Sequence, residues 1–240
     1  MKLTFLGTGD AVGTPKIGCS CENCTLAREL GIERLRTSLL VEEQGRHLLI
    51  DTSPDLRRQL LAAGSPRIDA VVWTHGHYDH YSGYGEFYRI QDQPPVYAVE
   101  DTLSYCSPLF GFLTFEEHRV EPYAPFTVCG LTVTLFPVNH PPMPTFGVRI
   151  GSPGGSVAYT GDTRADMPAR SSELLAGADL LVLDAIVPPE IRLSKHMNYG
   201  EALTVAREAR PREFRLVHLS HLIPWSFPHT ATDGESIPFP

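Results

Sequence analysis

The sequence predicts an α/β protein, a four-layer αββα sandwich that forms a single domain over residues 1–240. Short apolar runs typical of strands fill most of the chain, and a few helix-like segments lie between them. Histidine and aspartate residues follow directly after several of those strands, which is where α/β folds place their chemistry. With 240 residues and 42% hydrophobic content, the chain can bury a sizeable core.

The composition narrows the classes of partner. The formal net charge of −8 argues against an extended nucleic-acid surface, because long nucleic acids are usually held by a basic face. A small anionic substrate needs only local positive charge, so it is compatible with a negative net charge. No apolar run approaches the ~20 residues of a membrane helix, and residues 1–7 break too early for a signal peptide. We therefore expect no membrane association and a cytoplasmic protein, and the sequence leaves a homodimer open.

The first predicted strand covers residues 3–6 and runs into a glycine-rich turn over residues 7–13. A nucleotide-binding loop is an alternative, but the third glycine comes one position too late for GxGxxG and no Gly-Lys-Ser/Thr follows. We expect a tight turn at the edge of the sheet instead.

Three of the five cysteines, Cys19, Cys21 and Cys24, lie close together. In a reducing cytoplasm such a cluster is more often a metal site than a disulfide, and zinc prefers four tetrahedral sulfur or nitrogen ligands. Cys106 and Cys129 are isolated and are interpreted as small core residues. We therefore look for the fourth ligand in the histidine-rich C-terminal part. Incidental buried or redox-active thiols are the alternative.

Two strands are predicted over residues 38–43 and 46–50, and the second delivers Asp51 to the sheet edge. Ser53 and Pro54 then mark the start of a helix, as N-cap and first helical residue. An aspartate in the position of Asp51 can accept a hydrogen bond from a metal-binding histidine or can cap the next turn. The sequence leaves both roles open.

The densest group of candidate ligands is the run His75-Gly76-His77-Tyr78-Asp79-His80, which follows a short apolar strand. His75 and His77 are two positions apart, so on extended chain their side chains point the same way and can meet one metal ion. Asp79 and His80 follow a turn and face a different point. This division fits a pair of ions about 3.5–4 Å apart. A lone zinc or a surface histidine cluster is the alternative.

Two further candidates follow strands in the middle of the chain. His140 comes just after the strand predicted over residues 131–136, and Asp162 comes just after the strand predicted over residues 156–160. One oxygen of a carboxylate such as Asp162 can touch two cations and lower their mutual repulsion. A turn aspartate and a structural histidine are the alternatives.

The C-terminal part supplies the remaining candidates. An apolar strand ends at Asp184, and His196 lies on a loop before a helix predicted over residues 201–209, free to reach a substrate. His218 directly follows the last clear strand. His221, three positions later, is available as the fourth ligand of the cysteine group.

These residues resemble the metallo-β-lactamase superfamily. The resemblance covers nearly the whole chain: the HxHxDH run, the N-terminal Leu-Gly-Thr-Gly turn, the Tyr-Thr-Gly-Asp-Thr segment and the spaced histidines. It implies an αββα fold with two divalent cations, manganese or zinc, at the active site. In the implied ligand set, His75, His77 and His140 hold one cation, Asp79, His80 and His218 hold the other, and Asp162 bridges them.

Within the superfamily, the chain looks most like the PhnP family of phosphoribosyl cyclic phosphodiesterases. The shared features are the GCxCxxC segment, Thr-Phe-Gly after the third histidine, the loop of His196 and the final His-Leu-Ser-His. This resemblance implies that His196 assists cleavage of the phosphate ester, alongside Asp79 and Asp162. It also implies a structural zinc at Cys19, Cys21, Cys24 and His221.

The sequence therefore predicts a metal-dependent phosphodiesterase that acts on small, cyclic phosphodiesters. A metal-activated hydroxide attacks the phosphorus, and His196 protonates the leaving alkoxide. Three alternatives share the core. A transfer-RNA 3′-processing nuclease would need an RNA-gripping basic arm, which the interval between Asp162 and His196 lacks. A lactone or thioester hydrolase shares the metals, and a PqqB-like cofactor-biosynthesis protein has a similar cysteine segment.

Overall fold

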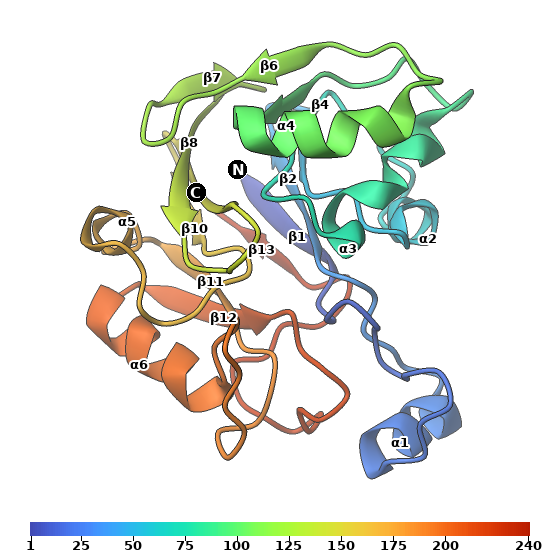
Figure 1. The fold of residues 1–240 in the computed structure, drawn as a ribbon, viewed down its shortest axis with the longest axis vertical. Helices are drawn as coiled ribbons and strands as arrows, with labels where there is room; N and C mark the ends of the chain where they lie inside the picture. Colours follow the sequence, from blue (N-terminus) through green and yellow to red (C-terminus); the bar gives the residue numbers. More distant parts are fainter.

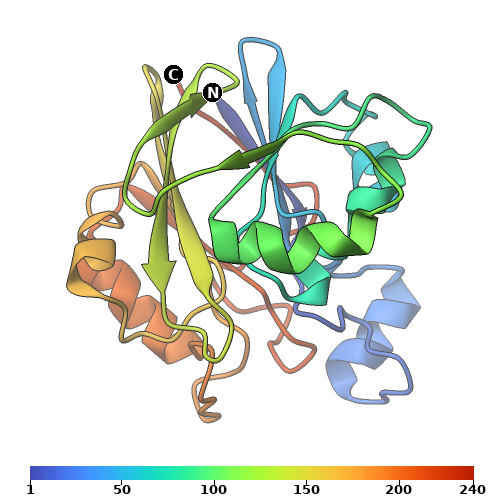
Figure 2. The ribbon, with the colours of Figure 1, turned by 45° about the horizontal axis from the view of Figure 1, so that its top comes forward.

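Two mixed β-sheets pack face to face, and helices cover their outer faces, in the computed structural model, which describes residues 1–240 (Figures 1 and 2). This is the predicted αββα sandwich, and the prediction is confirmed. None of the helices is both long enough and apolar enough to cross a membrane.

The first sheet has seven strands and changes from antiparallel to parallel pairing across its width. β1, β2 and β3 alternate in direction, whereas β3, β4, β5 and β6 run parallel, so these four end at the same edge. Across the sheet the order is β13 (Ser236–Pro238), β1 (Lys2–Gly7), β2 (Ser38–Glu43), β3 (Arg46–Ile50), β4 (Ala70–Val72), β5 (Val96–Ala98) and β6 (Glu117–Arg119).

The second sheet has six strands, of which β10, β11 and β12 run parallel. β7, β8, β9 and β10 pair antiparallel in sequence order. Across the sheet the order is β12 (Glu213–Val217), β11 (Leu180–Asp184), β10 (Gly155–Tyr159), β9 (Thr145–Ser152), β8 (Leu131–Val138) and β7 (Phe126–Val128).

Alternation along the strands divides the apolar residues between two sides of the first sheet. On β3, Leu48 and Ile50 join the core between the two sheets, whereas Leu49 joins the core beneath the outer helices together with Trp73. A third core, which includes Leu181, lies under α6. The helical segments are α1 (Glu22–Leu30), α2 (Leu56–Ala62), α3 (Tyr78–Tyr81), η1 (Ser82–Phe87), α4 (Glu100–Cys106), η2 (Ser107–Phe110), α5 (Ala169–Glu173) and α6 (Tyr199–Ala209).

Helix boundaries follow local capping where the sequence provides it. Asn198 and Glu201 form a reciprocal capping box at the start of α6, and this fixes the loop that carries His196 just upstream. The expected start of α2 is two residues too early: its N-cap is Asp55, because the Ser53 hydroxyl accepts the Asp55 backbone N–H ahead of the helix.

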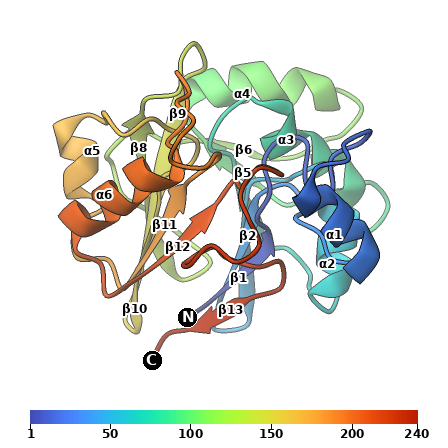
Figure 3. The same cartoon turned by 90° about the horizontal axis from the view of Figure 1, so that it is seen from below.

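The two chain ends are neighbours at one end of the first sheet. The C-terminal strand β13 pairs with β1, with Leu3 opposite Ile237, so the two termini end beside each other (Figure 3). β13 is thus an edge strand of this sheet.

Candidate metal centres

One edge of the sandwich collects the predicted rim ligands. Strand ends from both sheets converge there, and an isolated bridge between His75 and Thr145 joins the two sheets at this edge. The residues that follow the strand ends are Asp51 after β3, His75 after β4, His140 after β8, Asp162 after β10 and His218 after β12, while Asp184 is the last residue of β11.

A first group of ligand atoms comes from His75, His77, His140 and Asp162. The Nδ1 atom of His77 lies 3.1 Å from Nε2 of His75 and 3.0 Å from Nε2 of His140. Nitrogens that bind one zinc ion tetrahedrally at about 2.0–2.1 Å are about 3.3 Å apart. The three imidazoles are therefore already spaced as ligands of one ion.

A second group comes from Asp79, His80 and His218. Oδ2 of Asp79 lies 3.3 Å from Nε2 of His80 and 3.5 Å from Nε2 of His218. Oδ2 of Asp162 lies 3.4 Å from Nε2 of His80 and 3.3 Å from Nε2 of His218. The same Asp162 oxygen is 3.7 Å from Nε2 of His75 in the first group, so one atom faces both groups.

Buried atoms without hydrogen-bond partners show that this cluster suits cations. Nε2 of His80 and Oδ1 of Asp162 are both buried and accept or donate no hydrogen bond. Leaving buried polar atoms unpaired is costly, and Nε2 of His80 lies 3.3 Å from Oδ2 of Asp79 and 3.4 Å from Oδ2 of Asp162 without a hydrogen bond to either. Imidazole and carboxylate groups are ligands of zinc and manganese alike. The residues present therefore fit a pair of divalent cations.

Electrostatics favour the same interpretation. Burial lowers the pKa of His75 well below its usual range, and neighbouring His80 lowers it further, so His75 presents a neutral lone pair. Burial also lowers the pKa of His80, but Asp162, Asp79 and Asp51 outweigh burial and raise that pKa well above its usual value. The carboxylates thus draw positive charge to this edge, which divalent cations supply without a proton on each imidazole.

The imidazoles are held from behind by acceptors. Nδ1 of His80 donates to Oδ2 of Asp51 at 2.7 Å, which leaves Nε2 free to face the cluster. Asp51 also accepts the backbone N–H and the hydroxyl of Thr74, each at 2.8 Å. Of the two roles left open for Asp51, the structure has the acceptor for a histidine; the carboxylate also holds Thr74 and does not cap the turn that follows it. Nδ1 of His140 donates to the Lys195 carbonyl at 3.0 Å, an acceptor that no side-chain pattern could reveal.

His196 lies beside the cluster and is oriented by Asp184. Nδ1 of His196 donates to Oδ2 of Asp184 at 2.8 Å, and the ring stacks on His218 with centroids 5.0 Å apart. A possible ligand atom of His196 also lies within 4.8 Å of those of Asp162 and His218. Burial lowers the pKa of His196, but Asp184 outweighs it, so that the net pKa is raised. The sequence placed Asp184 at the edge without assigning it this role.

Two hollows adjoin the histidines. One of about 310 Å³ is lined by His196 and one of about 330 Å³ by His140, and Arg164 lines both. The Arg164 guanidinium pairs with Asp166 on the same loop and is partly exposed. An ion pair, and not an isolated basic group, therefore lies at the hollow next to His196.

The cysteine group forms a separate centre. Nδ1 of His221 lies 3.5 Å from Sγ of Cys19 and 3.3 Å from Sγ of Cys21, and Cys24 completes the group. Sulfur and nitrogen ligands of a tetrahedral zinc ion are about 3.5 Å apart, so this spacing fits zinc. Helix α1, which carries Cys24, projects from the sandwich (Figure 1). Cys106 and Cys129 are buried in the cores, as predicted.

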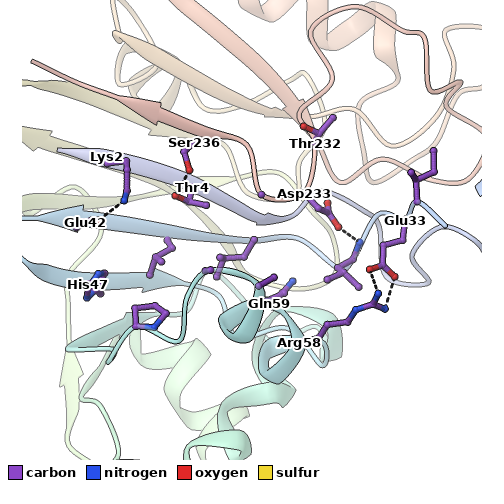
Figure 4. Close-up of a pocket in the computed structure, with 18 of the residues that line it drawn as sticks. Lys2, Thr4, Glu33, Glu42, His47, Arg58, Gln59, Thr232, Asp233 and Ser236 are labelled. Atoms are coloured by element: carbon purple, nitrogen blue, oxygen red, sulfur yellow. Dashed lines mark hydrogen bonds and ion pairs between the residues drawn. The ribbon is translucent and has the colours of Figure 1, made fainter. Parts of the chain in front are cut away.

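A larger hollow of about 690 Å³ lies away from both centres, on the outer face of β1 and β2 beside α2 (Figure 4). Its polar side chains pair with one another: Lys2 with Glu42, Thr4 with Ser236, and Arg58 with Glu33. None of the candidate metal ligands lines it. Size alone does not make it the site, because its paired groups do not converge on a ligand.

Comparisons with known proteins agree with this geometry. Residues 46–219 match the family described as beta-lactamase superfamily domain. A crystal structure of a diphosphatase from the PhnP family superposes with a TM-score of 0.88 at 32% identity, covering 100% of this chain and 98% of that one. Among curated relatives, coenzyme PQQ synthesis protein B of Methylobacterium nodulans is 32% identical over 78% of this chain and 73% of its own length.

One further relative is longer than this chain. An octanoyltransferase of Porphyromonas gingivalis is 32% identical over 93% of this chain, but this chain spans only 47% of that protein. The likeness therefore concerns about half of the octanoyltransferase.

Proposed function

Because the chain belongs to the metallo-β-lactamase superfamily, we propose that it is a metal-dependent phosphodiesterase that hydrolyses a phosphate ester in a small anionic substrate such as a cyclic phosphodiester. One observation carries the proposal. A single oxygen of Asp162 faces both histidine groups, and the oriented imidazole of His196 lies beside them. The likeness to a PhnP-family diphosphatase supports phosphorus chemistry.

Two divalent cations, manganese or zinc, would supply Lewis-acid stabilisation of the phosphate oxygens and an activated water when bound. His75, His77 and His140 would hold one and Asp79, His80 and His218 the other, with Asp162 between them. Asp51 and the Lys195 carbonyl orient the rings of His80 and His140 and would keep their Nε2 atoms available to the cations.

The proton for the leaving group comes from His196. Asp184 accepts its Nδ1–H and so leaves Nε2 to face the substrate. A protonated His196 can donate from Nε2 to the leaving alkoxide. Arg164 lines the adjoining hollows, but its partner Asp166 balances its charge, so the positive charge for an anionic substrate would come mainly from the bound cations. The negative net charge of the chain is no obstacle, because the charge that the substrate meets is local.

A second candidate is hydrolysis of an acyl ester or thioester. The match to half of an octanoyltransferase favours it, because that protein's name refers to acyl transfer. The likeness to PQQ synthesis protein B leaves a role in cofactor biosynthesis as a further alternative. All seven predicted ligands of the rim cluster lie close together, and this favours a catalytic role over a purely structural one.

A substrate panel separates these candidates. Protein loaded with manganese or zinc is assayed on bis-nitrophenyl phosphate, a 2′,3′-cyclic nucleotide, a nucleoside diphosphate, a lactone and an octanoyl thioester. We expect turnover of phosphate esters that is lost in Asp162→Asn and kept in Asp92→Asn, whose carboxylate is fully exposed away from the cluster. Turnover of the lactone or the thioester alone would contradict the proposal.

A further inference from the structure

The stretch His218 to His221 supplies one histidine to each metal centre. The backbone of His218 has a φ of 57°, in the left-handed region that residues other than glycine rarely adopt. Hydrogen bonds hold the residues that follow: the Leu219 N–H donates to the Thr8 carbonyl at 2.9 Å, and the Ser220 N–H donates to the Ile186 carbonyl at 3.0 Å. A small shift of this stretch would displace both histidines together.

Arg34 fixes the same stretch from the other side. It is only 3% exposed, and its guanidinium donates to the backbone carbonyls of Ser220 at 3.2 Å and Ile223 at 2.8 Å. A longer contact of 3.5 Å reaches the Pro224 carbonyl, and the Trp225 ring lies 4.2 Å from the guanidinium carbon. The planar fork of an arginine suits several carbonyls at once.

No carboxylate pairs directly with this buried guanidinium. Burial lowers the pKa of Arg34 to about 10, and the negative charges of Asp233 and Asp10 only partly offset this lowering. Burying a charged group without an ion-pair partner is unfavourable. A neutral side chain of similar length would avoid that cost, so the stabilising contribution of Arg34 lies in the carbonyls that it holds.

The cysteine loop is attached to the same residue. The backbone of Arg34 exchanges two hydrogen bonds with Thr14, at 2.8 and 3.0 Å, shortly before the cysteines begin. The Trp225 indole donates to the Asn23 carbonyl at 3.2 Å, and the Asn23 amide donates to the His221 carbonyl at 3.0 Å. Arg34 thus stands where the cysteine loop and the stretch that carries both histidines meet.

We propose that Arg34 is a positioning residue for both metal centres, one that keeps His218 turned to the rim and His221 turned to the cysteines. The two centres are then coupled, because a change in the backbone that Arg34 holds reaches both. For the rim, the proposal rests on the proposed function, which requires metal there.

Cobalt(II) is the probe. Its thiolate-to-cobalt absorption reports the cobalt bound at the cysteine centre, and equilibrium dialysis measures the total bound cobalt. The difference between the two is the cobalt bound at the rim. Both affinities are measured at a temperature well below unfolding for wild type, Arg34→Met, Arg34→Lys and the control Arg58→Met. Arg58 pairs with Glu33 on the surface. We expect Arg34→Met to weaken cobalt binding at both centres by about 10–100-fold, as loss of an orienting group does. Arg34→Lys should recover part of the loss, and Arg58→Met should match wild type.

Several outcomes would overturn the proposal. Unchanged affinities with a lower unfolding temperature would make Arg34 a purely structural residue, and a loss at the cysteines alone would refute the coupling. If Arg34→Met does not fold, Trp225→Leu removes the stacked ring instead and is expected to weaken both centres less strongly. If wild-type protein binds cobalt only at the cysteines, the proposed function is contradicted. If wild type binds cobalt at both centres and the Arg34 variant keeps both affinities, only the role of Arg34 is contradicted.

Discussion

The rim cluster and the cysteine centre receive neighbouring histidines, His218 and His221, but they are built in different ways. The rim ligands come from the segments that follow strands of both sheets, including the short helix α3 after β4, and nearly all of them are buried. Three of the cysteine centre's ligands are close in sequence, with Cys19 and Cys21 just before α1 and Cys24 within it, and Cys19, Cys21 and His221 are partly exposed. The sheets therefore hold most of the rim ligands in place, whereas a few hydrogen bonds, those of Thr14 with Arg34 and of Asn23 with His221 and Trp225, join the cysteine segment to the rest of the chain.

The two centres also differ in the hydrogen bonds that orient their ligand side chains. Asp51 and the Lys195 carbonyl orient rim imidazoles through short hydrogen bonds. In the cysteine centre, the support within the loop is a backbone N–H from Lys16 to Sγ of Cys24 at 3.3 Å and one from Cys21 to Sγ of Cys19 at 3.5 Å. The ligands of the rim are therefore preorganised, whereas we expect the cysteine centre to depend on a bound metal ion for its shape.

The largest expected effect tests whether the rim is a reaction centre. His196→Ala is expected to lower the rate on alkyl phosphodiesters by roughly 10²–10⁴-fold, because an alkoxide leaving group needs a proton. Nitrophenyl esters should lose much less, since nitrophenolate leaves without one. Rates on both ester types and the metal content of the variant are measured together. Equal losses on both, or loss of a metal, would return His196 to a positioning or ligand role.

The cysteine centre should respond in stability instead. Cys21→Ser is expected to remove one zinc per chain and to lower the free energy of unfolding by roughly 3–5 kcal/mol, because a zinc ligand lost from a loop with little other support exposes that loop to unfolding. Zinc analysis and thermal unfolding measure it, and Ser20→Ala, exposed on the same loop, is the control. By contrast, mild chelation that strips only the rim should leave the fold intact.

Either of two results would erase the contrast. A Cys21→Ser protein that stays fully stable with one zinc fewer would show that the loop does not depend on its metal. Unfolding on mild chelation while zinc remains at the cysteines would show that the rim ions, and not the sheets, hold the rim.

Preorganisation of the rim can be weakened without removing a ligand. Asp51→Asn keeps the shape of the side chain and tolerates the φ of 61° at this position, but it loses the carboxylate that accepts from His80. We expect metal affinity at the rim to fall by about 10–100-fold. Metal titration measures this, and Asp69→Asn, at the other end of β4, is the control. Unchanged affinity would mean that the sheets alone orient His80.

The two centres also differ in how much the sequence could reveal. Ligands close in sequence, such as His75 with His77 or Cys19 with Cys21, leave a spacing pattern that predicts shared geometry. Strand ends predicted the meeting of the more distant residues, because parallel strands end at one edge. The fold class and most of the strands could be predicted from the short apolar runs along the chain.

Long-range partners left no such signal. Asp184 precedes His196 by a loop without regular pattern, so their hydrogen bond could not be read from spacing. The Lys195 carbonyl is a backbone group, which has no residue signature at all. Arg34 reaches the Ser220 carbonyl across most of the chain, and only the packing of α1's loop against the C-terminal segment brings them together.

The smallest expected effect is a shift in pH dependence at the rim. Asp184 raises the pKa of His196 above its usual value against the opposing effect of burial. A proton donor is active while it is protonated, so the rate on alkyl phosphodiesters should fall as the pH rises through this pKa. Asp184→Asn removes the negative charge, lowers the pKa of His196 and should move the alkaline limb of the profile to lower pH. The profiles of kcat on alkyl esters measure the shift, with Asp179→Asn, near the other end of β11, as control.

The sign of that shift separates the role of a proton donor from that of a base. If His196 acted as a base, the rate would rise with pH through its pKa, and the loss of Asp184 would move an acidic limb to lower pH instead. A group that only orders its loop would change the size of kcat without moving either limb. Nitrophenyl esters provide the internal reference, because their cleavage needs no proton and their alkaline limb should stay in place in the same variant. A limb that moves on both ester types would assign the titration to another group at the rim, and His196 would lose its place as the donor.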